Sequence, residues 1–352
     1  MSEKTMDRPV SDTSADERLI RGGIARSIVT RPGFGAAIGI VVVFAFFAVG
    51  SSAFASPAGI SNWLDPASLI GLSAIPIALL MIGGEFDLSA GVMIASSSLV
   101  TAVFATEFGM NLWLAMLISL GFSALVGFLN GLLVVRTRLP SFIVTLGTFF
   151  VLQGLNQGVV KLITGTIRVD GLDAVPGYSS VYSVLASSFD VFGATIQVAE
   201  IWWVLATIVG SLVLTHSRWG NWIMSTGGDA IAARAMGVPV ERVKITLFIA
   251  VSVMSWFVGS ITAVILTSVT TSQGVGQELQ FIVAAVVGGC LLTGGRGSVL
   301  GASAAALIFG MVQVGIPYRG WDSNFYFAFL GAVLFLAVFF DAGIRSHFQV
   351  RK

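Results

Sequence analysis

The residues of this chain that could take part in chemistry are polar side chains set within long apolar stretches. Hydroxyl and amide groups of this kind can hydrogen-bond a neutral, hydroxyl-rich solute, and an aromatic ring beside them can provide an apolar wall. The candidates for such a substrate path are Asn130, Thr145, Thr148, Gln153, Asn156 and the aromatic Trp256. The same residue types also hydrogen-bond one membrane helix to another, and for any single residue this second interpretation is the simpler one.

Two acidic residues, Glu85 and Asp87, lie between two of the apolar stretches. Ionisable residues within or beside a membrane are candidates for function by default. Asp87 is therefore a candidate for a gate or for the substrate path, and it can also cap the helix that follows it, together with Ser89. For Glu85 we expect the simpler arrangement, in which the carboxylate faces water at the membrane interface.

The sequence offers little for catalysis or for metal binding. The chain has two histidines, His216 and His347, and one cysteine, Cys290. These are too few for a histidine-based metal cluster or for an internal disulfide. The chain contains no Gly-x-x-x-x-Gly-Lys-[Ser/Thr] phosphate-binding loop. We expect no catalytic residue, no metal and no cofactor in this chain.

The overall composition indicates what kind of chain holds these polar residues. Of its 352 residues, 55% are hydrophobic and 11% are charged, and the mean hydropathy is +0.91. A soluble protein carries about a quarter of its residues as charged ones, so an ordinary soluble enzyme, a disordered chain and a disulfide scaffold are excluded. The net charge of +1 excludes a basic nucleic-acid binder.

The charged residues are placed so unevenly that they divide the chain into segments. A helix needs about 20 apolar residues to cross a membrane, with a range of roughly 17–25, and lipid cannot hydrogen-bond a bare backbone. We therefore predict an all-α, polytopic integral membrane protein with about ten transmembrane helices. The charge-free stretches are 33–55, 67–84, 88–106, 111–135, 139–160, 201–217, 245–277, 279–295, 297–318 and 323–340. The second and the eighth are short and contain glycine, so either one could be re-entrant or broken.

The basic residues predict the orientation. If the N-terminus is cytoplasmic, 16 of the 19 Lys and Arg residues lie on the cytoplasmic side, and only Lys161, Arg168 and Arg319 lie outside. Cytoplasmic loops of membrane proteins carry an excess of Lys and Arg. We therefore expect both termini to be cytoplasmic.

The predicted organisation has three parts. Residues 1–32 form a polar, disordered cytoplasmic tail, residues 33–345 form the transmembrane domain, and residues 346–352 form a short cytoplasmic tail. Two loops of the transmembrane domain exceed turn length. One is a periplasmic loop at about 161–200, in which a short interfacial helix is expected, and the other is a cytoplasmic loop at about 218–244.

The cytoplasmic loop has the signals of a short helix that is capped at both ends. Asp229 is a good N-cap, and residues 230–236 are strong helix formers. Gly237 suits the position after the helix, and Pro239 prevents its continuation. These signals predict a helix of about two turns, followed by a second helical segment with Glu241, Arg242 and Lys244 that leads into the next crossing.

This loop resembles the coupling-helix motif of ABC importer permeases, Glu-Ala-Ala-x-x-x-Gly. The chain matches the motif at Ala232, Ala233 and Gly237. It departs from the motif at Ile231, which replaces the Glu, and it lacks the apolar-Pro ending. The wider pattern is closer to the sugar-permease branch of the family, the ribose/xylose/arabinose/galactose type.

Three further segments resemble the signature blocks of the same branch, in order and at plausible spacing over residues 63–316. They are Gly83-Gly84-Glu85-Phe86-Asp87-Leu88-Ser89-Ala90-Gly91, then Asn130-Gly131-Leu132-Leu133-Val134 with residues 139–148, and then Gly294-Gly295-Arg296-Gly297-Ser298-Val299-Leu300-Gly301. The paired glycines at 83–84 and 294–295 also occupy like positions, which is a weak indication of two related halves.

The resemblance implies a permease subunit of a bacterial ABC importer, multi-pass in the cell inner membrane, for a pentose, a hexose or a polyol. Its implied partners are separate ATP-binding subunits, a periplasmic sugar-binding protein, and a second permease copy in a homodimer within the lipid bilayer. The residues implied in coupling to the ATP-binding subunits are Asp229, Ala232, Ala233 and Gly237.

Other functions remain open at this point. A related permease could carry branched-chain amino acids or a signalling sugar. An ion-coupled secondary transporter would need titratable residues at mid-membrane, and the charge-free stretches disfavour it. A membrane enzyme is disfavoured because the chain lacks a recognisable set of nucleophile and base.

Overall fold

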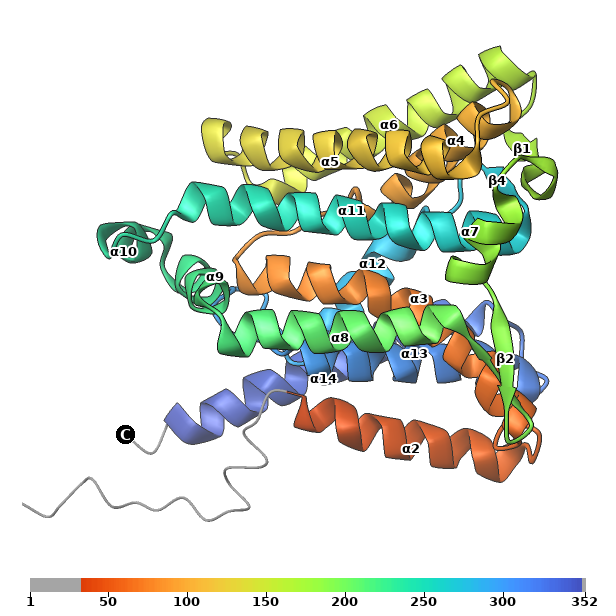
Figure 1. The fold of residues 1–352 in the computed structure, drawn as a ribbon. Coiled ribbons are helices and arrows are strands. Elements are labelled where there is room, and N and C mark those ends of the chain that lie inside the picture. The colour runs from red at the N-terminus through yellow and green to blue at the C-terminus, as the bar shows by residue number, and fades with distance from the viewer. Residues whose placement is uncertain (1–32, 350–352) are drawn as a thin grey trace, which may run out of the picture.

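The computed structural model describes residues 33–349, and within them the chain forms a bundle of long helices whose axes run in roughly the same direction (Figure 1). Six helices are long and apolar enough to cross a membrane, by length and composition. They are α3 (Pro57–Ile82), α5 (Leu112–Thr137), α6 (Ser141–Thr164), α8 (Val198–His216), α11 (Val240–Leu266) and α13 (Val299–Tyr318).

Four further apolar helices complete the set. They are α2 (Phe34–Gly50), α4 (Ala90–Thr106), α12 (Gln277–Val287) and α14 (Phe325–Gln349). Each of the ten charge-free stretches therefore contains one helix, and the predicted polytopic, helical fold class is confirmed. The tail predicted at 1–32 lies outside the described residues.

The second and the eighth predicted crossings, either of which could be re-entrant or broken, differ from each other in the structure. The second is a continuous helix of 26 residues, so the expected break is wrong. It extends well before the charge-free stretch, because Asp65 and Pro66 lie inside the helix. The eighth is short as expected, with 11 residues in α12. The third, α4, is also short, with 17 residues.

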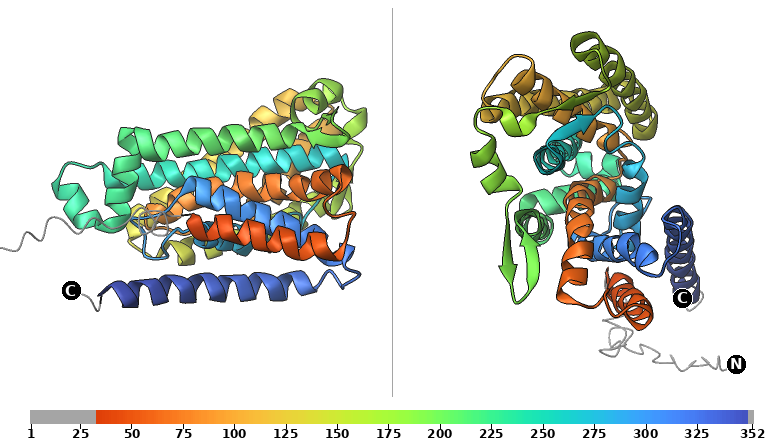
Figure 2. Two further views of the ribbon diagram at one scale, coloured as in Figure 1. Left: turned by 90° about the horizontal axis from the view of Figure 1, so that it is seen from below. Right: turned by 90° about the vertical axis from the view of Figure 1, so that its right-hand side faces the viewer.

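The centre of the bundle is α3, which packs against α8, α11, α12 and α13. Its most apolar window is 78% buried, against 39% for α5 and 22% for α6. Figure 2 shows α5 and α6 on one flank and α2 and α14 on the other. Since the helices at the centre touch protein on all sides, they connect the elements at the two ends of the bundle.

The two ends of the bundle differ in structure (Figure 1). One end, here the α10 end, carries α9 (Arg218–Gly228) and α10 (Ala230–Ala235). The other, here the β1 end, carries the 3₁₀ helix η2 (Leu172–Ala174), α7 (Tyr178–Leu185) and two antiparallel strand pairs. The pairs join β1 (Arg168–Asp170) to β4 (Ser268–Thr270) and β2 (Ser188–Val191) to β3 (Ala194–Gln197). Thus α7 is the short helix expected in the long loop, whereas the strands were not predicted.

The N-termini of the two short helices, α4 and α12, meet inside the bundle. A Cβ atom on Gly91, in α4, would lie 2.5 Å from the carbonyl oxygen of Gly274, just before α12. A carboxylate stands at each N-terminus: Asp87 precedes α4, and Glu278 begins α12 and accepts a 2.9 Å hydrogen bond from the backbone N–H of Gly276. Negative charge at these positions is favourable because a helix N-terminus carries partial positive charge.

Candidate functional site

The helix predicted in the cytoplasmic loop is present as α10. Asp229 caps its N-terminus, and its Oδ1 accepts hydrogen bonds from the backbone N–H groups of Ile231 (2.9 Å) and Ala232 (3.0 Å). At the C-terminus Gly237 has φ +82°, and the N–H of Val238 donates to the carbonyl of Ala233 at 3.0 Å. A positive φ favours glycine, and this turn satisfies carbonyl groups that the helix end leaves free. Both predicted caps are confirmed.

Two large apolar side chains, one on α10 and one at its C-cap, are strongly exposed, and the motif emphasises neither of them. Ile231 is 81% exposed and Met236 is 85% exposed, whereas Ala233 is only 4% exposed and faces the rest of the chain. Ala232 is exposed. Sequence reasoning treated Ile231 only as a departure from the motif and did not single out Met236. The signal that could have identified them is a pair of large apolar residues, one on a short capped helix and one at its end, in a loop outside the predicted crossings.

Three glycine-containing segments meet at the base of this loop. A Cβ on Gly227 would overlap the carbonyl oxygen of Ile82 and would lie 2.7 Å from the nitrogen of Gly295. A Cβ on Gly294 would lie 2.8 Å from the Cα of Gly84, and the N–H of Gly295 donates a 2.8 Å hydrogen bond to Ile82. We call this contact the glycine junction. The glycine pairs at 83–84 and 294–295, noted for their like positions in the sequence, therefore touch each other.

The glycine junction joins the loop at 218–244 to both short helices. Gly227 precedes α10 by a few residues, Gly84 lies in the segment that leads to α4, and Gly294 and Gly295 lie between α12 and α13. Because the backbones touch directly, a displacement of one segment moves the other two.

Glu85 does not face water, contrary to the prediction. It is 7% exposed and forms an ion pair with Lys244 near the start of α11. Burying a carboxylate without a partner is costly, and the ammonium group supplies that partner. This ion pair is a second connection between the loop at 218–244, which α11 follows, and the segment before α4.

Hydroxyl groups of α6 hold the non-helical segment between α3 and α4. The backbone N–H of Phe86 donates to Ser141 Oγ at 2.9 Å, and that of Leu88 donates to Thr145 Oγ1 at 3.1 Å. Ser141 and Thr145 are about one helical turn, or about 6 Å, apart, which is close to the separation of alternate residues in an extended chain. The hydroxyls therefore satisfy backbone donors that no helix satisfies.

A buried hydrogen-bond chain continues from this segment. Asp87 Oδ1 accepts from the N–H of Ser89 (2.7 Å) and from its hydroxyl (2.6 Å). Asn130 Nδ2 donates to Ser89 Oγ at 3.0 Å, and Thr148 Oγ1 donates to Asn130 Oδ1 at 2.6 Å. Asn130 lies seven residues before the end of α5 at Thr137, about 10 Å along the helix. The segment therefore enters the bundle from the α10 end.

The structure thus brings together Asp87, Asn130, Thr145 and Thr148, and leaves the other candidates elsewhere. Trp256 Nε1 donates to Met116 O (3.1 Å) and to Ser119 Oγ (2.8 Å), so its indole joins α11 to α5. Gln153 and Asn156 lie further along α6.

These arrangements resemble structural hydrogen bonding more than a substrate path. A cavity of about 630 Å³ lies elsewhere, between α3, α12 and α14, and none of the seven residues predicted for the substrate path lines it. Their assignment to that path stays a prediction.

Comparison with known proteins agrees with this arrangement. A family described as the permease component of branched-chain amino acid transport systems matches residues 59–338. The chain is 29% identical to the fructose import permease protein of Rhizobium meliloti, over 87% of this chain and 85% of that protein. It is also 29% identical to the L-arabinose ABC transporter permease protein of Azospirillum brasilense, over 98% and 96% of the two chains. The ribose import permease protein of Bacillus subtilis is 29% identical as well, over 86% and 91%.

No solved structure matches the chain significantly. The family match, by contrast, begins in α3, ends in α14 and includes the loop at 218–244, the glycine junction and the buried hydrogen-bond chain. A match over most of the chain identifies the family, and the chain is therefore a member of this family of membrane transport permeases.

Proposed function

We propose that this chain is the permease subunit of an ABC importer that carries a monosaccharide or a polyol across the inner membrane. The similar proteins are named as permeases for fructose, L-arabinose and ribose. ATP is hydrolysed by separate subunits, since the chain has no phosphate-binding loop of its own.

The observation that carries this proposal is the construction of α10. A rigid helix, capped by Asp229 and Gly237, presents Ile231 and Met236 to its surroundings. Exposed apolar side chains on a short helix suit a groove on a partner protein. The partner is an ATP-binding subunit, and the docked residues include Ala232 together with Ile231 and Met236.

Coupling then follows from the contacts at the base of α10. When the ATP-binding subunits close, the docked helix moves. The glycine junction and the ion pair between Glu85 and Lys244 carry that movement to the segments beside α4 and α12. These two helices are short and begin inside the bundle after non-helical segments, and helices that begin or break within the membrane commonly surround the substrate site of a transporter. Their displacement opens the path alternately to the two sides.

The proposed orientation places the α10 end in the cytoplasm and the β1 end in the periplasm. The excess of Lys and Arg on the α10 side of the chain supports it. A periplasmic sugar-binding protein docks at the β1 end. Two copies of this chain pair in the membrane, and the transport path lies between the two copies. Both termini are cytoplasmic.

The test is uptake in a strain that lacks its own monosaccharide importers and expresses this chain with the ATP-binding and binding-protein subunits encoded beside it. The panel contains labelled ribose, xylose, arabinose, galactose and fructose, with leucine included because the family description names branched-chain amino acids. ATP-dependent uptake of one sugar is the expected result. Uptake of leucine alone, or sugar uptake that persists without the ATP-binding subunits, would contradict the proposal.

A further inference from the structure

The cavity of about 630 Å³ has the size and lining of a small-molecule site. Ligand sites typically enclose about 300–1,000 Å³ and combine an apolar wall with a few convergent polar groups. Its wall includes Phe281, Tyr326 and Phe327, and its polar groups come from the turn before α12, from α12 itself and from α13.

Glutamine side chains are concentrated in this cavity. The chain has eight glutamines, and four of them line it: Gln273, Gln277, Gln280 and Gln313. Each amide has two donor hydrogens and an acceptor oxygen. Together they provide the paired donors and acceptors that adjacent sugar hydroxyls require.

One of these amides has an unsatisfied nitrogen. Gln273 Nε2 is buried and has no hydrogen-bond partner within the described residues. A buried donor without a partner costs about 1–3 kcal/mol, so a group that accepts from it would be favoured. By contrast, Gln280, which is 8% exposed, already donates to the hydroxyl of Tyr326. That bond fixes the Tyr326 ring beside the cavity.

The residues that line the cavity favour a neutral ligand over a charged one. No Asp, Glu, Lys or Arg is among the residues that line the cavity. The N-terminus of α12, which would attract a carboxylate, already has the Glu278 carboxylate, whose Oε2 accepts from the N–H of Gly276. A zwitterionic amino acid therefore finds no oppositely charged side chain for either of its charges.

Exposed polar groups show which side of the cavity is open. Gln277 and Gln313 are exposed although both lie on apolar helices. Polar side chains in membrane helices generally face protein or a water-filled space rather than lipid. The open side of the cavity therefore faces protein or water rather than lipid.

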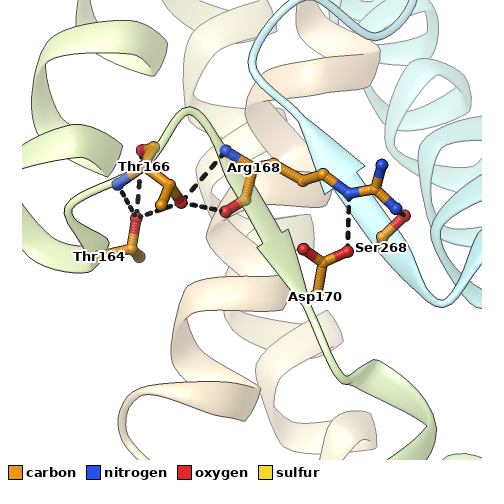
Figure 3. Close-up of polar contacts among 5 residues, drawn as sticks. All are labelled: Thr164, Thr166, Arg168, Asp170 and Ser268. Atoms are coloured by element: carbon orange, nitrogen blue, oxygen red, sulfur yellow. Dashed lines mark hydrogen bonds and ion pairs between the residues drawn. The ribbon is translucent and has the colours of Figure 1, made fainter.

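The two-stranded β1–β4 ladder ends just before the turn that carries Gln273, and Figure 3 shows the side-chain contacts of Arg168 across it. Arg168 Nε donates to Asp170 Oδ1 at 2.6 Å, and its Nη2 donates to Ser268 Oγ at 2.9 Å. The N–H of Thr271 donates to Ile167 O at 3.1 Å. Thr271 is followed at once by the turn that carries Gln273, so the ladder positions this amide.

We infer that this cavity is the site at which the permease binds its sugar, through the amides of Gln273, Gln277 and Gln313 and the rings of Phe281 and Tyr326. The inference rests on the proposed function, because it specifies where in the permease the monosaccharide binds.

The first experiment measures uptake by the complete transporter in proteoliposomes. Gln273→Leu and Gln313→Leu keep the approximate size of the side chain and remove its hydrogen bonds. We expect each to slow uptake of the transported sugar by about tenfold, with ATP hydrolysis retained. Gln157→Leu is the matched control, since Gln157 lies exposed on the membrane helix α6 outside the cavity, and it should transport as the unmodified protein does.

The second experiment measures occupancy directly. Cys290 is the single cysteine and is 3% exposed, so Gln313→Cys in a Cys290→Ala background places one reactive thiol at the cavity. The transported sugar should slow maleimide labelling of this thiol in the complete transporter. It should not slow labelling of Gln157→Cys, an exposed position on α6.

The outcomes separate the two proposals. Slower uptake by both cavity variants with protection at position 313 supports the sugar site. Normal uptake by both variants without protection, while the unmodified transporter imports a sugar, overturns the site and leaves the proposed function standing. If the unmodified transporter imports no sugar of the panel, the proposed function fails and the sugar site fails with it.

Discussion

Lys244, near the start of α11, forms an ion pair with Glu85, which lies 159 positions earlier in the non-helical segment between α3 and α4. The side chains are 21% and 10% exposed, so the pair is largely shielded from water. It joins the helix that follows α10 to the segment that precedes α4. The glycine junction connects the same two parts of the chain a second time, because Gly84, directly before Glu85, touches Gly227.

Removing one member of this ion pair should destabilise the α10 end of the bundle. Glu85→Gln leaves the Lys244 ammonium without its counterion, at a cost on the order of 3 kcal/mol. We expect a lower thermal unfolding temperature in detergent and less uptake per ATP hydrolysed. The double exchange Glu85→Lys with Lys244→Glu should recover part of both.

The control for this prediction is Glu241→Gln. Glu241 also has a basic partner, Arg234 at 3.8 Å, but those side chains are 65% and 59% exposed, and exposed pairs contribute little. If Glu85→Gln is no more damaging than Glu241→Gln, the ion pair does not connect the two segments.

Adjacent glycines of α9 provide a second, closely matched comparison. Gly227→Ala would drive a methyl group into Ile82 and Gly295, whereas a Cβ on Gly228 meets no atom within 4 Å. Both residues lie in the same helix, so the helical propensity of alanine is gained in each case. Overpacking typically costs about 1–3 kcal/mol. Gly227→Ala should therefore lower thermal stability and uptake while Gly228→Ala leaves them near normal, and equal effects would argue against the glycine junction.

The N-cap of α10 can be tested by side-chain chemistry alone. Asp229→Ala removes the acceptor for two backbone N–H groups and should cost about 1 kcal/mol. Asp229→Asn keeps a capping oxygen and should behave nearly as the unmodified protein does. The readout is the ratio of solute imported to ATP hydrolysed in proteoliposomes. If Asp229→Ala keeps the normal ratio, a rigid α10 is not required for coupling.

Local signals in the sequence were enough to predict the main elements. The distribution of charges located ten apolar helices, six of them long enough to cross a membrane, because a charged residue is costly in lipid and so marks their ends. The caps of α10 were predicted because Asp229 and Gly237 act on their own neighbours in the chain. The same rule misplaced the start of α3, since Asp65 is tolerated inside that helix.

Contacts between distant segments could not be predicted in this way. Glu85 was expected to face water because nothing near it in the sequence reveals Lys244. The glutamines at 273, 277 and 280 are close in sequence, but only the fold brings Gln313 to the same cavity. Likewise, the hydroxyl of Ser141 was not singled out, because its backbone partner Phe86 lies 55 positions away.

The central claim is that the exposed apolar side chains of Ile231, on α10, and Met236, at its C-cap, bind the ATP-binding subunit. The most direct measurement is the amount of that subunit that copurifies with the permease in detergent. Ile231→Asp and Met236→Asp should each abolish most of this copurification without loss of folded permease, because they place a charge at a surface that the partner covers. Phe192→Asp, at the fully exposed tip of the hairpin at the β1 end, should leave it unchanged. Normal recovery of the ATP-binding subunit with both α10 variants would contradict the account.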